Sequence, residues 1–205
     1  MDPACVAATQ MAAGLCHEWG HKIVEAAPEV DFESLQTAMV AIININLASV
    51  LEIRAKAKGR ELKPEDVEKI TWRAAATGRK ISATAYAQAV LTMHRASRQI
   101  AKFFENYDIL LSPVLLSPPV DLGYLDMMSE DAGQYLKNLS SFFGFTSMFN
   151  ATGQPAMSVP LYWTNDNLPV GLQFAARYGD EATLFRLAAQ LEASCPWKDR
   201  RPDLP

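Results

Sequence analysis

The sequence predicts a mixed α/β fold, in which helices surround a mixed sheet. Apolar residues recur at intervals of three and four over long stretches, which is the period of an amphipathic helix. Two runs in the last third, 156–163 and 170–177, instead alternate like strands. The chain has 205 residues, of which 49% are hydrophobic and 20% charged, a composition typical of a globular protein. Strands among helices exclude all-α and all-β classes.

The first third is predicted to contain two helices and a strand. Asp2 and Pro3 form an N-cap and a first helical residue, and the periodicity continues to Gly20. The run Lys22 to Ala26 alternates like a strand and ends before Pro28. Asp31 caps the second helix, and its predicted inward stripe is Leu35, Met39, Ile42, Ile43 and Val50.

The middle of the chain is predicted to be mostly helical. Residues 56–64 form a charged loop, and Pro64 opens a short helix. The segment 71–79 stays undecided because Gly78 interrupts it. A long helix follows from about Ser82 to Asn106.

The remaining elements are a strand, a loop, a helix and a hairpin with its closing helix. The short apolar run 108–112 predicts a buried strand, and the prolines of 113–123 allow only loop or extended chain. Another helix begins near Ala132. The strands 156–163 and 170–177 form a hairpin in which Pro160 requires an edge or a bulge. Asp180 caps the last helix.

Composition and charge exclude several classes of function. The net charge of −4, with scattered basic residues, gives no electrostatic footprint for nucleic acid. The apolar stretches 39–51 and 109–116 fall short of the roughly 20 residues that cross a bilayer, so we expect no membrane partner. No secretory signal is visible at the N-terminus. Three cysteines fit no disulfide framework and favour a cytoplasmic location.

One short motif matches a zinc peptidase. His17, Glu18 and His21 have the His-Glu-x-x-His spacing, in which two histidines on one helical face bind zinc and the glutamate acts as base. Gly20 opposes this reading, because a glycine there is typical of a helix end and would carry His21 off the face. No third ligand is singled out by spacing among Glu33, Glu52 and His94. A solvated helix end is favoured, with no metal bound.

Nucleophilic catalysis within this chain is also disfavoured. A reactive serine needs a base and a glycine-rich turn that presents it beside backbone donors, and no Gly-x-Ser-x-Gly occurs. Ser140 and Ser141 lie in an apolar helical run and are interpreted as helix surface. Cys5 and Cys16 lie near the inward face of the first helix, where a small apolar side chain is the ordinary role.

Three blocks, in this order and spacing, carry a family resemblance. They are Phe149-Asn-Ala-Thr-Gly-Gln-Pro-Ala-Met-Ser-Val-Pro160, Leu168-Pro-Val-Gly-Leu-Gln-Phe174 and Asp180-Glu-Ala-Thr-Leu-Phe185. Together with Gly20-His21 and Tyr107-Asp-Ile-Leu-Leu-Ser-Pro113, they resemble the C-terminal part of the amidase signature family. The helical segment with Asn44-Ile-Asn46 most resembles the branch near the 6-aminohexanoate cyclic dimer hydrolases.

The resemblance implies that residues 1–205 are the C-terminal portion of a single amidase-signature domain, with the helical segment 31–106 as a subregion. It implies a serine amide hydrolase that needs no cofactor and acts on a small amide. The family uses two serines and a lysine, and their motifs do not occur in these residues. We therefore carry over no catalytic residue and expect the chain alone to be inactive. Its start at Met1-Asp-Pro suggests a piece of a longer protein.

By resemblance, this portion supplies part of the acyl pocket. The best candidates lie in the segment 150–155, where glycine and proline fix a loop. They are Asn150, Thr152, Gly153 and Gln154. An equally weighted alternative is that the polar groups only satisfy their own turn. Asn46, in the middle of the second helix's stripe, is predicted to be buried, with a structural role favoured over contact with a ligand.

Two other functions stay open at this point. One is the zinc peptidase, and the other is a binding or assembly module without catalysis. Part of a larger sheet would also leave an open strand edge and an apolar patch, so we predict that the chain self-associates.

Overall fold

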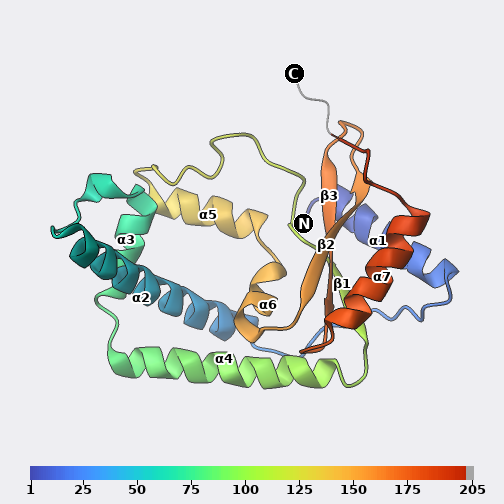
Figure 1. Cartoon of the computed structure of the whole chain (residues 1–205), viewed down its shortest axis with the longest axis horizontal. Helices are drawn as coiled ribbons and strands as arrows, with labels where there is room; N and C mark the ends of the chain where they lie inside the picture. The colour runs from blue at the N-terminus through green and yellow to red at the C-terminus, as the bar shows by residue number, and fades with distance from the viewer. Residues whose placement is uncertain (202–205) are drawn as a thin grey trace. The chain divides into compact units, whose positions relative to one another are not determined.

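A computed structural model of the chain describes residues 1–201. Its helices and strands are labelled in Figure 1. The helices are α1 (Pro3–Glu18), α2 (Phe32–Lys58), the 3₁₀ helix η1 (Pro64–Asp66), α3 (Lys69–Gly78), α4 (Ala83–Phe103), α5 (Ala132–Phe142), α6 (Thr146–Thr152) and α7 (Glu181–Ser194). The strands are β1 (Ile109–Pro113), β2 (Ala156–Trp163) and β3 (Pro169–Ala176). The mixed α/β class is thus confirmed.

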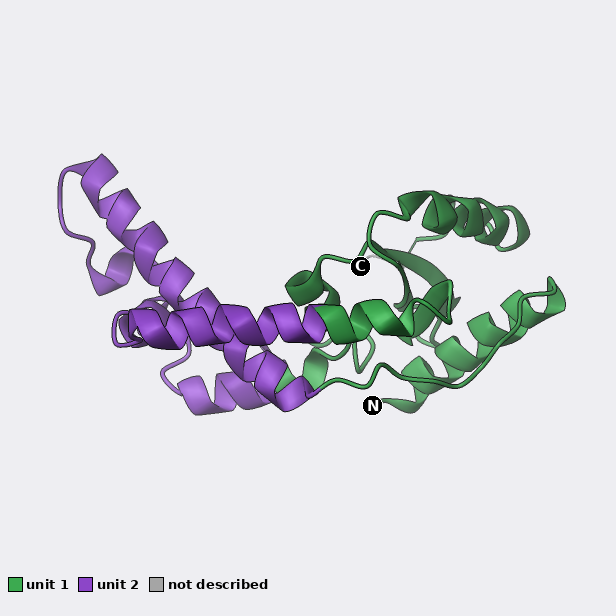
Figure 2. Ribbon diagram, turned by 90° about the horizontal axis from the view of Figure 1, so that it is seen from below, with its two compact units in different colours: residues 1–30, 98–121, 140–205 green, residues 31–97, 122–139 purple. Residues whose placement is uncertain are grey.

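The chain divides into two compact units, coloured separately in Figure 2. Unit 1 consists of residues 1–30, 98–121 and 140–205, and unit 2 consists of residues 31–97 and 122–139. Unit 2 thus takes in a segment after residue 121 that lies outside the helical subregion predicted from sequence.

Unit 1 contains the sheet that the described residues form. Its strand order is β1-β3-β2, and both pairings are antiparallel. The register of β2 shifts between Val159 and Tyr162, around Pro160, because proline cannot donate to a ladder. The predicted edge position and irregularity of β2 are therefore confirmed. The strand predicted at 22–26 is wrong, since these residues form no regular structure.

The sheet packs its apolar face against α1 and α7. Alternate residues of β3, Val170, Leu172, Phe174 and Ala176, are buried among Cys5, Ala8, Ala12 and Cys16 of α1 and Leu184, Leu187 and Leu191 of α7. This alternation is the one that the sequence predicted for the second hairpin strand. A second cluster contains Ala175 of β3 with Ile100, Phe104, Leu110, Met148 and Phe149. The central strand β3 is therefore buried by apolar side chains on both of its faces.

In unit 2, α2 packs against α3 with small residues at the contact. Ala48, Leu51 and Ala75 form the buried cluster. A Cβ added at Gly78 would lie 2.0 Å from the carbonyl oxygen of Asn44, so only glycine allows this approach. The predicted inward stripe of α2 is partly wrong. Leu35 is buried, but Ile43 and Val50 are exposed, while alanines at 38 and 48 are buried. Apolar residues occur on several faces of α2, and periodicity could not show that the alanines pack inward.

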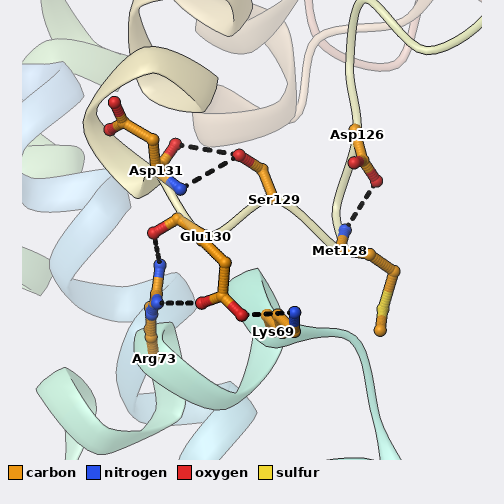
Figure 3. A network of polar contacts seen from close by, with 7 residues as sticks. All are labelled: Lys69, Arg73, Asp126, Met128, Ser129, Glu130 and Asp131. Carbon is orange, nitrogen blue, oxygen red and sulfur yellow. Dashed lines mark hydrogen bonds and ion pairs between the residues drawn. The ribbon is translucent and has the colours of Figure 1, made fainter.

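A polar network connects α3 to the segment 126–131 within unit 2 (Figure 3). The Lys69 ammonium lies 2.5 Å and the Arg73 guanidinium 3.0 Å from the Glu130 carboxylate. Arg73 also donates to the backbone carbonyl of Glu130 at 2.6 Å. The hydrogen bond from Lys69, followed by the nearby positive charges, lowers the pKa of the Glu130 carboxyl. Of the segment undecided from sequence, residues 71–78 are thus helical, and Arg73 anchors them by an ion pair.

Helix α2 is long and apolar enough to cross a bilayer by length and composition. It has 27 residues and continues to Lys58. The charged loop predicted to start at residue 56 therefore starts after Lys58. Part of its surface packs against α3 through Ala48 and Leu51, and 22% of its apolar window is buried.

Candidate substrate-pocket segment

The predicted pocket segment forms a short helix and its C-cap. Of the turn predicted at 150–155, residues 150–152 instead form the end of helix α6 (Thr146–Thr152), and Gly153 ends that helix with φ +80°, a conformation that favours glycine. The Gly153 N–H donates to the Phe149 carbonyl at 2.8 Å. The predicted loop is therefore corrected at its N-terminal part, because Met148 and Phe149 anchor α6 in the core.

The structure brings two of the candidate side chains together. The Thr152 hydroxyl donates to the Met148 carbonyl at 2.9 Å and also contacts the side-chain oxygen of Gln154. Gln154 is buried, while Asn150 is exposed. Of the two alternatives, the hydrogen bonds of Thr152 fit the one in which polar groups satisfy their own turn.

The prediction that Asn46 is buried is wrong. Asn46 is exposed on α2, in unit 2. The neighbouring Asn44 instead provides the carbonyl that Gly78 approaches. The cause is the same as for the stripe of α2: alanines face inward, which turns the position of Asn46 towards solvent.

Sequence reasoning missed a polar row that crosses the sheet. Gln173 of β3 lies opposite Ser112 of β1 and Ser158 of β2 in the strand register. The Gln173 amide nitrogen donates to the Ser112 hydroxyl at 3.1 Å, and both residues are 5% exposed. The only sequence signal was a glutamine in a strand of otherwise apolar and small residues. Its partner could be identified only from the register.

The His-Glu-x-x-His motif does not form a helical metal face. Helix α1 ends at Glu18, and Gly20 has φ +86°, so the predicted helix end is confirmed. The ring nitrogen Nε2 of His21 lies 3.1 Å from the side-chain oxygen of Gln190 on α7. Within residues 1–201, no group of three or more His, Cys, Asp or Glu side chains could hold a metal ion.

The cysteine thiols of α1 have the properties of core side chains. Cys5 and Cys16 are buried, and their burial raises the pKa of both thiols above the usual value. A raised pKa keeps a thiol protonated, which is the opposite of what a nucleophilic cysteine needs. Both therefore act as small apolar residues, as expected.

A cavity of about 560 Å³ lies in unit 1 beside β1. Its apolar wall includes Ile109 and Leu111 of β1, Phe174 of β3 and Leu187 of α7. The segment His21 to Val24 forms another part of the lining. None of the four candidates in the segment 150–154 lines this cavity.

Comparison with known proteins identifies relatives of the whole chain. The family model described as Amidase matches residues 1–185. The 6-aminohexanoate-cyclic-dimer hydrolase of Pseudomonas sp. (strain NK87) is 30% identical over 211 aligned residues, covering all of this chain and 43% of that protein. A lipoamidase of Enterococcus faecalis is 27% identical, covering 94% of this chain and 30% of its own length. The chain thus spans less than half the length of these relatives.

Solved structures agree with the sequence relatives. A structure of 6-aminohexanoate cyclic dimer hydrolase superimposes with a TM-score of 0.84 and 29% identity, over 99% of this chain and 44% of that one. A crystal structure of an amidase at 19% identity and a TM-score of 0.71 shares the fold.

These matches give no support to the zinc peptidase alternative, and their coverage agrees with a C-terminal piece of an amide hydrolase. The family predicted from the block 149–160 and the two blocks after it is confirmed. The chain belongs to the amidase signature family.

Proposed function

We propose that this chain is the C-terminal portion of an amide hydrolase whose catalytic serines and lysine belong to a part of the domain outside these 205 residues. The family match over residues 1–185 supports this proposal. A second support is that the whole chain aligns with the Pseudomonas relative but covers only 43% of that protein. In this portion, the sheet and the segment 150–154 shape one side of the acyl pocket. The chain by itself is inactive, and the full domain needs no cofactor.

The substrate of the complete enzyme is a small linear or cyclic amide. Two hydrolases of 6-aminohexanoate cyclic dimer match the full length of this chain, which makes a cyclic amide the first substrate to test. The protein is cytoplasmic, a location that fits its three free cysteines. It binds neither nucleic acid nor membrane.

The first experiment measures amide hydrolysis by the purified chain. We expect no release of amine from 6-aminohexanoate cyclic dimer or from a simple carboxamide, because no serine here combines a base with a donor-lined turn. A mixture with the remaining portion of the Pseudomonas relative should hydrolyse the amide if the two portions complement each other. Turnover by the chain alone, blocked by a serine-directed reagent, would contradict the proposal.

A second experiment tests the pocket role of the segment 150–154. Asn150→Ala changes an exposed side chain, so we expect the fold to keep its stability. In the complemented enzyme, a contact with substrate predicts a raised KM or a lowered kcat. The matched control is Asn165→Ala, an exposed asparagine in the turn between β2 and β3. Equal kinetic constants for the two variants would show that Asn150 does not contact the substrate.

A further inference from the structure

Helix α2 has apolar side chains that its own contacts leave uncovered. Only 22% of its apolar window is buried, and its contact with α3 uses Ala48 and Leu51. Val40 and Ile43 are each 50% exposed, and Val50 is 44% exposed. Several exposed apolar side chains on one helix indicate an interaction surface.

These side chains form one stripe along α2. Its positions follow one another at intervals of three, four and three residues, the spacing of the contact positions in a coiled coil. They are Val40, Ile43, Leu47 and Val50. Leu47 is partly buried and completes the stripe. The stripe therefore has the pattern against which a second helix packs.

The stripe is symmetric about the middle of α2. Residue 45 is the midpoint of the helix. Val40 and Val50 lie five residues on either side of it, and Ile43 and Leu47 lie two residues on either side. In an antiparallel pair of α2 helices centred on this point, Val40 of each copy faces Val50 of the other. A two-fold axis at residue 45 therefore makes the stripe complementary to itself.

The charges at the two ends of α2 fit the same arrangement. Glu33 lies in the first turn and Lys58 in the last, and both are exposed. Glu33 precedes Val40 by two turns and Lys58 follows it by five, so both lie on the side of the stripe. Antiparallel pairing places Glu33 of one copy near Lys58 of the other at each end, whereas parallel pairing would bring like charges together. Charge thus selects the antiparallel direction.

We propose that α2 packs against α2 of a second copy of this chain, antiparallel and centred on residue 45. The stripe forms the apolar centre of the interface, and Glu33 and Lys58 form an ion pair at each end. A lipid bilayer is a competing partner, but an anionic lipid surface would attract Lys58 and repel Glu33. The surface belongs to unit 2, whereas the segment 150–154 belongs to unit 1, and no step of amide hydrolysis depends on it.

Cysteine cross-linking tests the direction and register of the pair. Val40→Cys and Val50→Cys are made separately in a chain with Cys195→Ser, since Cys5 and Cys16 are buried. After mixing, a short bismaleimide should link the two variants to each other. Neither should link to itself, because two copies of residue 40 lie about 15 Å apart along the helix axis. Links of each variant to itself, or no link at all, would overturn the proposal.

Sedimentation equilibrium measures the strength of the interface in a chain with Val24→Lys, which opposes pairing through strand edges. Ile43→Glu places two carboxylates near the two-fold axis and should raise the dissociation constant of the dimer at least about tenfold. Leu136→Glu, at a similarly exposed leucine of α5, is the matched control and should change it little. Equal effects of these two glutamate variants would contradict the interface.

A charge exchange tests the ion pair at the ends of the helix. Glu33→Lys and Lys58→Glu should each weaken the dimer, because each brings like charges together. The double variant should recover the affinity, since it exchanges the two partners. Two weakened single variants without recovery would show that these side chains do not face each other, and would overturn the antiparallel register.

The other occupants of the stripe are tested directly. Flotation with vesicles of phosphatidylcholine and phosphatidylserine should leave the chain unbound, and binding that Ile43→Glu abolishes would identify a bilayer as the partner. The cross-link between positions 40 and 50 should persist when the remaining portion of the Pseudomonas relative is added. Its loss would mean that this portion covers the stripe. Either result would overturn the proposal.

Discussion

Single side chains in this protein matter most where a polar group is buried. The amide of Gln173 and the hydroxyl of Ser112 satisfy each other across β3 and β1 in a largely apolar sheet. A buried polar group that loses its partner costs more than the hydrogen bond contributed, because its contacts with water are not restored. The pair therefore stabilises the sheet mainly through the penalty for breaking it.

For this reason, Gln173→Ala should lower the free energy of unfolding by about 1–3 kcal/mol. Urea denaturation followed by circular dichroism measures the change. Gln36→Ala, at an exposed glutamine of α2, is the control and should stay within about 0.5 kcal/mol of the unchanged protein. Equal stabilities of the two variants would mean that the hydrogen bond has no energetic role.

The Glu130 carboxylate makes the stability of unit 2 depend on pH. Its pKa is lowered in the folded state by Lys69 and Arg73. A lowered pKa gives stabilisation that is present above the unfolded value, near 4.3, and is lost as the pH falls through the folded value. The ion pairs should therefore stabilise unit 2 at neutral pH, and this stabilisation should be lost in acid, when Glu130 is protonated.

We expect Glu130→Gln to be less stable than the unchanged protein at pH 7, with the difference shrinking as the pH falls below about 4. Urea denaturation at a series of pH values measures this. Glu25→Gln, at an exposed glutamate without an ion pair in the described residues, controls for a general effect of charge. A constant difference across the pH range would contradict the assigned cause.

Among the elements, α2 and α3 depend on one glycine for their close packing. The absence of a side chain at Gly78 lets α3 approach the backbone of α2 at Asn44. By contrast, Gly14 of α1 faces open space, so nothing would contact an added Cβ. Both glycines lie in helices, but a side chain would clash at Gly78 and would meet no neighbour at Gly14. The two positions therefore form a matched pair for substitution.

Gly78→Ala should destabilise the protein by about 1–3 kcal/mol, because the helices must separate to admit the methyl group. Gly14→Ala should stabilise it by about 0.5–1 kcal/mol, since alanine is the better helix former. Thermal denaturation of both variants measures whether each substitution lowers or raises the stability. A neutral Gly78→Ala would show that α2 and α3 are not in close contact in solution.

At the scale of the whole molecule, the three-stranded sheet is small, and both of its edge strands lack a further partner strand among residues 1–201. Both β1 and β2 pair only with β3 among residues 1–201. Exposed apolar side chains include Ile23 and Val24 near β1. Open strand edges and apolar patches favour association with another chain.

We therefore predict that the purified chain self-associates. Sedimentation velocity over a range of concentrations should show a mass above 22.6 kDa that rises with concentration. Val24→Lys should reduce this association, because a charged side chain near a strand edge opposes pairing. A monodisperse monomer at all concentrations would refute the prediction.

The sequence by itself determined the fold class, most of the elements and the family. Caps such as Asp2, Asp31 and Asp180, the alternation of 170–176 and the proline at 160 are local signals, and each had the predicted outcome. Tertiary structure decided which face of α2 is inward, the exposure of Asn46, the helix at 146–152 and the absence of a strand at 22–26. The reason is physical: caps and turns act within a few residues, whereas burial and strand pairing require partners distant in the sequence.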